Sequence, residues 1–246
     1  MRLEGKTAIV TGAGSGFGAG IARVFAREGA NVMMADLNGD AAAEIAAEIG
    51  GIAQTVDVAD GTSVAAMTRA AMDAWGRIDI LINNAGITHL PAPLEDVSEA
   101  DFDRVLAVNA KSVYLTAREI VPLMKAAGTG AILNVASTAG LSPRPMLNWY
   151  NASKGWMITA TKTMAVELAP AGIRVNAICP VAGETPLLAS FMGEDTPEIR
   201  ARFLSTIPLG RFSQPQDMGE AAAFLCSDAA SMITGVALEV DGGRCI

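Results

Sequence analysis

Short apolar runs alternate with longer segments of helical period along almost the whole chain. The run at 7–10 is typical of a buried strand, and the segment 18–28 places Ile21, Val24 and Phe25 on one helical face. The same alternation continues toward the end of the chain. It predicts further strands at 31–35, up to 57, and at 78–82, 131–136, 174–179 and 236–240, and further helices at 40–49, 63–75, 98–125 and 150–168.

This alternation predicts an α/β fold. Right-handed crossovers between successive strands give a parallel sheet with helices on both faces, a doubly wound sheet of the Rossmann type. No linker or change in composition divides the chain, so we expect a single domain over residues 1–246. Residues 185–214 contain Pro186, Pro197 and Pro208 and fall outside the alternation. They predict a short insertion that covers the crevice at the strand ends as a lid.

Composition narrows the class of protein. Of the 246 residues, 51% are hydrophobic, which excludes a disordered chain. Lysine and arginine number 18 against 26 aspartates and glutamates, for a net charge of −8. A surface with this charge repels phosphate groups, so we expect no binding to nucleic acid or to an anionic membrane.

The cysteines and the apolar runs bear on the compartment. Three widely spaced cysteines without a CxxC pair predict neither a disulfide framework nor a zinc site, and we expect no bound metal. No targeting signal is visible, and no uninterrupted apolar stretch approaches the roughly 18 residues of a membrane span. We therefore expect a soluble, cytoplasmic protein.

A glycine-rich segment, T-G-A-G-S-G-F-G at 11–18, lies between the first predicted strand and the first predicted helix. Its glycines let backbone N–H groups approach a pyrophosphate at the helix N-terminus. The next strand ends at Asp36, whose carboxylate accepts hydrogen bonds from an adenosine ribose and repels a 2′-phosphate. Neither Ser15 nor Leu37 supplies a basic side chain for that phosphate. The pattern predicts bound NAD rather than NADP.

Tyr150, Lys154 and Ser137 carry the candidate acid–base chemistry. Tyr150 and Lys154 are four residues apart in a predicted helix, so their side chains share one face. Free tyrosine has a pKa of about 10. We expect the ammonium and the positive nicotinamide of NAD⁺ to lower this pKa, so that Tyr150 exchanges a proton with a substrate hydroxyl. Ser137, at the carboxyl end of a predicted strand, is expected to hold the substrate oxygen.

The chain resembles the short-chain dehydrogenase/reductase family, in its short single-domain branch. The resemblance rests on the spacing T-G-x-x-x-G-x-G at 11–18, on N-N-A-G at 83–86, and on Asn109, Ser137 and Y-x-A-S-K at 150–154 in that order. It implies an oxidoreductase in which Lys154 also binds the nicotinamide ribose and Asn109 supports a water that relays protons to Lys154. It further implies a homotetramer formed by the long helices and the C-terminal strand.

These observations give a set of expected site residues. The catalytic residues are Asn109, Ser137, Tyr150 and Lys154. The residues expected to contact NAD are Gly12, Ser15, Gly16, Phe17, Gly18, Asp36, Leu37, Asp57, Val58, Asn83, Ala85, Gly86, Tyr150, Lys154, Pro180, Val181, Gly183 and Thr185. The family's Pro-Gly after the sixth strand is replaced by P-V-A-G-E-T at 180–185, and this departure leaves the backbone path beside the nicotinamide open.

Some other residues have no clear functional assignment. His89, the only histidine, is expected to be a solvated loop residue, and the alternative is a place at the border of the substrate pocket. Tyr114 is expected to pack within its helix. Four apolar residues fit a lid and fit ordinary packing equally: Phe191, Met192, Phe203 and Leu204.

The predicted activity is that of an NAD-dependent oxidoreductase that interconverts a secondary alcohol and a ketone. We expect its small-molecule substrate to be an alcohol, polyol, sugar or hydroxy acid. One alternative is a 3-oxoacyl-carrier-protein reductase. This alternative is disfavoured by Asp36, by the acidic chain and by the uncharged turns at 126–127 and 170–171. A remote alternative is a non-catalytic dinucleotide-binding regulator, which the intact catalytic positions disfavour.

Overall fold

One parallel sheet organises the structure, a computed structural model that describes residues 1–246. Its strands are β1 (Thr7–Thr11), β2 (Asn31–Asp36), β3 (Ile52–Thr55), β4 (Ile80–Asn83), β5 (Gly130–Val135), β6 (Ile173–Pro180) and β7 (Ala237–Val240). The seven strands lie in the order β3-β2-β1-β4-β5-β6-β7, and all neighbouring pairs are parallel. The central strands β1 and β4 are buried along their whole length, as their apolar sequences require. The predicted doubly wound α/β fold is confirmed.

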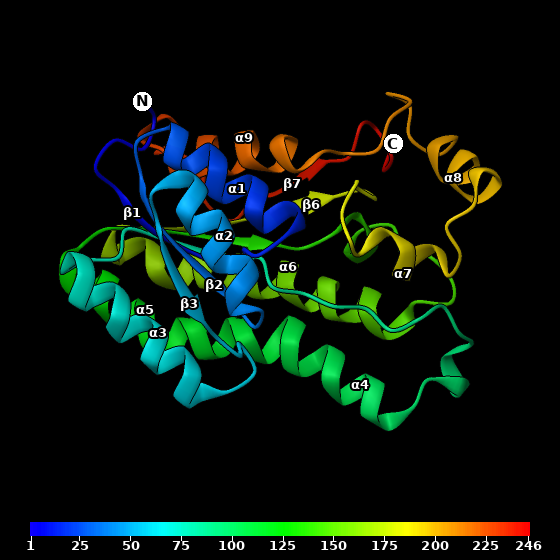
Figure 1. The fold of residues 1–246 in the computed structure, drawn as a ribbon, viewed down its shortest axis with the longest axis horizontal. Helices are drawn as coiled ribbons and strands as arrows, with labels where there is room; N and C mark the ends of the chain where they lie inside the picture. The colour runs from blue at the N-terminus through cyan, green and yellow to red at the C-terminus, as the bar shows by residue number, and fades with distance from the viewer.

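Helices cover both faces of the sheet (Figure 1). On one face lie α1 (Gly16–Arg27), α2 (Gly39–Ile49) and α9 (Pro215–Cys226), and on the other lie α3 (Gly61–Trp75), α5 (Ser112–Ala127) and α6 (Asn148–Leu168). Two apolar clusters fill the space between sheet and helices. One contains Phe25 and Met218 of α1 and α9, and the other contains Met67 and Ile120 of α3 and α5. Both faces of the sheet are thereby shielded from water.

The predicted helix at 98–125 contains a π-helical turn. It consists of α4 (Glu99–Leu106), the π turn η2 (Ala107–Lys111) and α5. Within the turn, the side chain of Asn109 bonds to the backbone of Ile87 and to the Ser153 hydroxyl. The apolar period did not predict this turn, because one inserted residue alters the spacing of apolar positions only slightly.

Residues 185–214 form two short helices, α7 (Leu188–Met192) and α8 (Pro197–Leu204), beside the carboxyl ends of the strands (Figure 1). A small apolar cluster that includes Val181, Met192 and Phe212 holds the segment to the rest of the fold. The turn after α8 meets the C-terminal loop, where the Leu209 N–H donates to the Gly242 carbonyl at 3.1 Å. That this segment acts as a lid stays a prediction.

A few boundaries differ from the sequence-based ones. Strand β3 ends at Thr55 rather than at Asp57, and β4 begins at Ile80 rather than at Ile78. Short 3-10 turns occur at Leu94–Asp96, Thr138–Gly140, Ala169–Ala171 and Asp228–Ala230. Nowhere does a helix combine the length and the apolarity needed to cross a membrane.

Candidate active site

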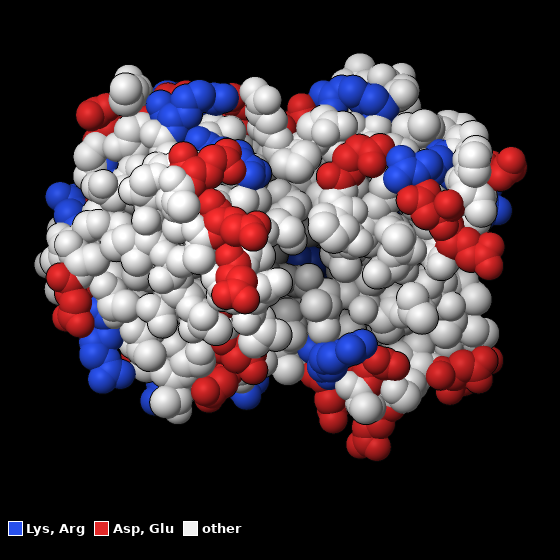
Figure 2. Space-filling model, in the orientation of Figure 1, with Lys and Arg blue, Asp and Glu red and all other residues white.

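A cleft of about 460 Å³ opens at the carboxyl ends of the strands. It lies where the strand order reverses, because β1 has β2 on one side and β4 on the other. The loops after β1 and β4 therefore diverge and leave a crevice between them, the place where doubly wound sheets bind ligands. Figure 2 shows the hollow between two lobes of the molecule, with the blue of a basic side chain inside it.

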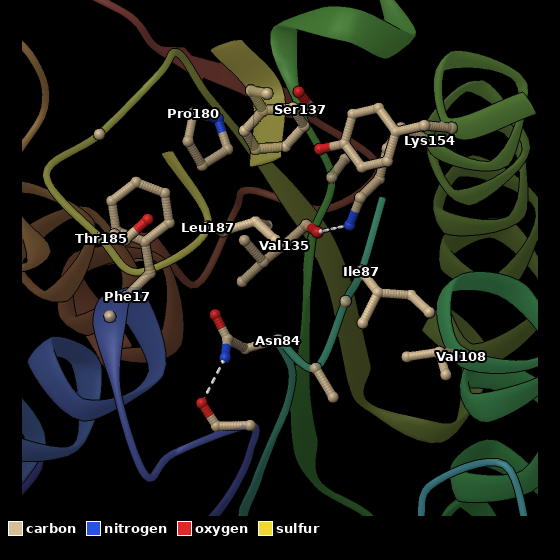
Figure 3. A pocket seen from close by; sticks show the side chains of 18 of the residues that line it. Phe17, Asn84, Ile87, Val108, Val135, Ser137, Lys154, Pro180, Thr185 and Leu187 are labelled. Atoms are coloured by element: carbon tan, nitrogen blue, oxygen red, sulfur yellow. Dashed lines mark hydrogen bonds between the residues drawn. The ribbon is translucent and has the colours of Figure 1, made fainter. Parts of the chain in front are cut away.

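The glycine-rich loop forms one wall of this cleft. Gly12 and Gly16 have positive φ values of 63° and 53°, which favour glycine. A Cβ atom at Gly12 would lie 2.8 Å from the Ala85 Cα, so the loop after β1 packs closely on the loop after β4. The Asn84 amide fixes this contact by donating to the carbonyls of Thr11 at 2.8 Å and Gly12 at 3.0 Å. Figure 3 shows one of these two bonds.

The N-terminus of α1 points its unpaired donors into the same wall. Ser15 is the N-cap residue, and its side chain makes no capping hydrogen bond. The first-turn N–H groups of an α-helix lack intrahelical partners and carry about half a positive charge. Ser15, Gly16 and Phe17 line the cleft, so this helix end fits the pyrophosphate of a dinucleotide.

Asp36 marks the adenosine end of the cleft. One of its carboxylate oxygens accepts from the Gly14 N–H at 2.8 Å, and the other accepts from the Asn38 N–H at 2.9 Å. These bonds hold the carboxylate beside the glycine-rich loop, where it can accept from ribose hydroxyls and repels a phosphate. Asp57 and Val58 line the cleft next to it. The residues present therefore fit a dinucleotide without a 2′-phosphate.

Ser137, Tyr150 and Lys154 meet at the opposite end of the cleft, and Figure 3 shows Ser137 and Lys154 near each other there. Tyr150 and Lys154 lie one turn apart in α6 and are buried. Lys154 Nζ donates to the Val135 carbonyl at 2.8 Å and lies 5.9 Å from the centroid of the Tyr150 ring. Ser137 Oγ accepts from the Ala139 N–H at 3.0 Å, in the turn that follows β5.

Burial dominates the titration of Tyr150 in the chain alone. Burial raises the pKa of Tyr150 to about 12, whereas a hydrogen bond with Ser137 and the charge of Arg144 oppose this rise. Burial also lowers the pKa of Lys154 to about 8. The lowering of the Tyr150 pKa that we expect from Lys154 together with the positive nicotinamide of NAD⁺ stays a prediction.

Asn109 lies just behind the catalytic end. Its Oδ1 accepts from the Ile87 N–H at 2.9 Å, and its Nδ2 donates to the Ile87 carbonyl at 2.9 Å and to Ser153 Oγ at 3.0 Å. A Cβ atom at Gly86 would lie 3.2 Å from Lys154 Nζ and 3.4 Å from Asn109 Oδ1, so Gly86 keeps the two side chains close together. This proximity is compatible with the implied water relay between Asn109 and Lys154.

The departure at 180–185 has a structural explanation. A Cβ atom at Gly183 would lie 2.4 Å from the Phe17 ring and 2.8 Å from Ser213 Oγ, so only glycine fits there. Gly183 and Ser213 also form an isolated parallel bridge. Val181 is buried in the apolar cluster that it forms with residues of the segment 185–214, and it lines the cleft. The displaced glycine thus serves the packing of this loop on α1.

Comparison with known proteins agrees with this geometry. A family model described as enoyl-(acyl carrier protein) reductase matches residues 12–244. The chain is 50% identical over 250 residues to 4-formylbenzenesulfonate dehydrogenase of Comamonas testosteroni, with 99% of each protein covered. It is 40% identical to a 3-oxoacyl-[acyl-carrier-protein] reductase of Thermotoga maritima, with 100% of each covered. The chain belongs to the short-chain dehydrogenase/reductase family.

Solved structures show the same relationship. A 3-ketoacyl-(acyl-carrier-protein) reductase from Brucella melitensis, complexed with NADH, is 51% identical and superposes with a TM-score of 0.95 over 99% of this chain and 100% of that one. The chain is accordingly an oxidoreductase of the short-chain dehydrogenase/reductase family.

Most of the residues expected from the family pattern line one cleft. They are Gly12, Ser15, Gly16, Phe17, Asp36, Leu37, Asp57, Val58, Ala85, Gly86, Ser137, Tyr150, Lys154, Pro180, Val181, Gly183 and Thr185. Asn109, Gly18 and Asn83 lie beneath the lining. Gly18 packs on the glycine-rich loop, where its Cβ would meet the Gly12 carbonyl at 2.1 Å. Asn83 bonds to Asn134 and Thr116, both at 2.8 Å. The individual roles stay predictions.

Sequence reasoning did not find four residues that help to shape the catalytic end. Ile87, Arg144, Leu147 and Leu187 line it. They come from loops without a regular apolar period, so no pattern marked them. The aromatic residues at 191 and 203, which fitted both a lid and ordinary packing, do line the cleft.

Two other expectations need correction. His89 is buried rather than solvated, with Nδ1 2.8 Å from the Leu90 carbonyl, and it does not line the cleft. A loop position in the sequence does not show that the ring is buried and bonds to the next backbone carbonyl. Tyr114 is 57% exposed on α5 rather than packed, because it falls on the face of that helix turned away from the sheet.

Proposed function

We propose that this chain is an NAD(H)-dependent oxidoreductase that interconverts a secondary alcohol and a ketone, with Tyr150 as general acid and base. One observation carries the proposal: Ser137, Tyr150 and Lys154 line the same cleft as the glycine-rich loop and Asp36. The cofactor is NAD(H), since the Brucella structure contains NADH and the Asp36 carboxylate opposes a 2′-phosphate.

Each residue has a defined task in this reaction. Ser137 holds the substrate oxygen beside the Tyr150 hydroxyl. In oxidation the Tyr150 phenolate takes the hydroxyl proton, and in reduction the phenol returns it to the ketone oxygen. When bound, NAD⁺ accepts a hydride from the substrate carbon, and NADH donates it in the reverse direction. Lys154 positions the nicotinamide ribose and, with Asn109 and a water, passes the proton of Tyr150 to solvent.

The substrate we favour is a small alcohol, polyol, sugar or hydroxy acid. The Comamonas relative is named for a small aromatic substrate, which supports a compact molecule in this cleft. The alternative is reduction of a 3-oxoacyl carrier protein, because the Thermotoga relative and the Brucella structure bear that name. Against it stand Asp36 and the net charge of −8, since an acidic carrier docks on a basic rim.

The test is the formation of NADH from NAD⁺ with a panel of secondary alcohols, polyols, sugars, hydroxy acids, 4-formylbenzenesulfonate and a 3-hydroxyacyl thioester. We expect Tyr150→Phe to lower kcat about 10²- to 10⁴-fold, the usual contribution of a general acid–base group. Tyr114→Phe is the matched control, because it removes the same hydroxyl from an exposed tyrosine. Oxidation of the aldehyde alone, or of no alcohol at all, would exclude alcohol–ketone interconversion.

We also propose a cytoplasmic location. Cys179, Cys226 and Cys245 are all free thiols, which agrees with a reducing compartment. Cell fractionation against a cytoplasmic marker enzyme tests this, and recovery with a membrane or secreted fraction would contradict it.

A further inference from the structure

Acidic and basic side chains lie at opposite ends of the cleft. Of the charged residues in its lining, the carboxylates Asp36 and Asp57 lie at the adenosine end, and the cations Arg144 and Lys154 lie at the catalytic end. Lys154 is already bonded to the Val135 carbonyl. The catalytic end is thus positively charged in a chain of net charge −8, and Arg144 is the cation there without a partner.

Arg144 has no acidic partner. The ionisable groups that act on its guanidinium are Arg244, Tyr150 and Cys245, with no aspartate or glutamate among them. Two arginines of residues 185–214 differ from it: Arg200 pairs with Glu184 and Asp195, and Arg211 pairs with Asp217. The third, Arg202, has no ion pair but is exposed to solvent. Because partial burial of a charge is costly without an opposite charge, the site of Arg144 favours an anion supplied from outside the chain.

Two contacts hold Arg144 at the cleft wall. Its backbone carbonyl accepts from Asn151 Nδ2 of α6 at 2.7 Å. Its guanidinium carbon lies 4.5 Å from the centroid of the Phe203 ring on α8. A cation–π contact stabilises the charge without using the N–H donors. Those donors remain available in the forked arrangement that matches two oxygens of one anionic group.

An aromatic wall connects Arg144 with the reacting end. Phe203 lies against Arg144, and Phe191 lies with its ring centroid 5.1 Å from that of Tyr150. Both phenylalanines line the cleft. A small apolar or aromatic body placed on this wall therefore has Tyr150 at one end and Arg144 at the other.

Arg244 adds a second positive charge near Arg144. It lies in the C-terminal loop, which is joined to the turn after α8 by the bond from Leu209 to Gly242. Burial, and after it the charge of Arg244, lowers the pKa of Arg144, and the buried Nε of Arg244 has no hydrogen-bond partner. Two like charges near one another destabilise each other, and an anion bound at Arg144 relieves this repulsion.

We propose that the substrate of this enzyme carries a carboxylate, sulfonate or phosphate group, and that Arg144 binds this group while Ser137 and Tyr150 hold the oxygen that reacts. The inference rests on the proposed function and narrows its substrate class. It makes a neutral alcohol or an unmodified sugar a poorer substrate than an anionic molecule of the same shape.

The first test uses probes that need no turnover. Benzenesulfonate and its neutral analogue benzenesulfonamide are titrated calorimetrically into protein saturated with NADH. The variants are Arg144→Met, which keeps an unbranched apolar side chain, and Arg144→Lys, which keeps the charge. Arg202→Met is the matched control, because Arg202 is exposed on α8, next to Phe203, and does not line the cleft.

We expect the wild type and Arg202→Met to bind the sulfonate at least about tenfold more tightly than the sulfonamide, as a bidentate charge-assisted pair requires. Arg144→Met should lose this preference while its Kd for NADH stays unchanged, and Arg144→Lys should keep part of it. The proposal is overturned by equal binding of both probes to the wild type, by no binding of either, or by a preference that persists in Arg144→Met. Weaker NADH binding in Arg144→Met would also overturn the proposal, because it would show that Arg144 binds the cofactor rather than the substrate.

A second test measures turnover and distinguishes failure of the anion site from failure of the proposed oxidoreductase activity. The substrates are 1-(4-sulfophenyl)ethanol and 1-phenylethanol. We expect the wild type to have a higher kcat/KM for the sulfonated alcohol, and we expect Arg144→Met to abolish this difference. Equal oxidation of both alcohols overturns the anion site and leaves the oxidoreductase activity standing. Arg144-dependent sulfonate binding without oxidation of any alcohol supports the anion site and overturns the proposed function.

Discussion

Tyr150 decides how the site responds to pH. Burial raises its pKa to about 12, so at neutral pH the side chain is a phenol, the form that donates a proton to a ketone oxygen. Oxidation needs the phenolate, and at pH values below the pKa its fraction increases about tenfold for each unit by which the pH rises. The chain by itself therefore favours the protonated phenol of Tyr150. Nearby positive charges, such as that of Arg144, oppose this effect by lowering the pKa.

We predict that kcat/KM for alcohol oxidation rises from neutral to alkaline pH, whereas kcat/KM for ketone reduction stays level or falls. Initial rates in both directions, in buffers of constant ionic strength, measure this. Arg144→Met should move the rising limb to more alkaline pH when a neutral alcohol is used, because the Arg144 charge lowers the Tyr150 pKa. An oxidation rate that falls as pH rises would contradict the role of Tyr150 as base.

The predicted role of Asp36 in the choice between NAD and NADP can be tested with one substitution. Asp36→Ala removes the acceptor for the ribose hydroxyls and the charge that repels a 2′-phosphate. We expect NADH binding to weaken about tenfold, the loss of roughly one charge-assisted hydrogen bond, while the ratio of NADPH to NADH affinity increases. Fluorescence titration with both cofactors measures it. Asp40→Ala, an exposed carboxylate on α2 outside the cleft, is the control, and a wild type that already prefers NADPH would refute the assignment.

Between elements, the packing of α1 on α9 leaves no room for a side chain at Gly20. A Cβ atom there would lie 2.4 Å from the Pro215 Cβ and 2.5 Å from its carbonyl carbon. Gly20→Ala should therefore lower the free energy of unfolding by about 1–3 kcal/mol through overpacking, measured by denaturant unfolding. Gly61→Ala is the control, because its Cβ would meet only the Leu115 side chain, at 3.5 Å. Equal stability of the two variants would show that the helices separate freely.

The elements that were predictable from the sequence are those with strong local signals. Strand β1 and helix α1 follow from an apolar run, a glycine-rich loop and a helical period in succession. The π turn around Asn109 and the contact between Arg144 and Phe203 depend on residues far apart in the chain. Local patterns carry no information about such pairs. The glycine-rich loop and the residues Ser137, Tyr150 and Lys154 were thus predictable as parts of one cleft, whereas the contact of Arg144 with Phe203 at its catalytic end was not.

For the whole molecule, apolar side chains on the outer face of α5 and α6 indicate a partner. Tyr114 of α5 and Trp156 and Val166 of α6 are exposed, and Val166 is 80% exposed. Exposed apolar groups gathered on one layer of helices are typical of interfaces between subunits. The homotetramer that we expect from the family resemblance would use the long helices and the C-terminal strand, so a measurement of the oligomeric state also tests this surface.

We predict that light scattering coupled to size exclusion gives a mass four times the 25.3 kDa of one chain. Val166→Asp should reduce this mass, because a carboxylate at an apolar interface remains desolvated without a partner. The same change costs the single subunit little, since the residue is 80% exposed there. Ala43→Asp, which adds the same charge to the exposed surface of α2 on the opposite face of the sheet, should leave the mass unchanged. A wild-type mass of one chain would refute the tetramer, and an unchanged mass in Val166→Asp would place the interface elsewhere.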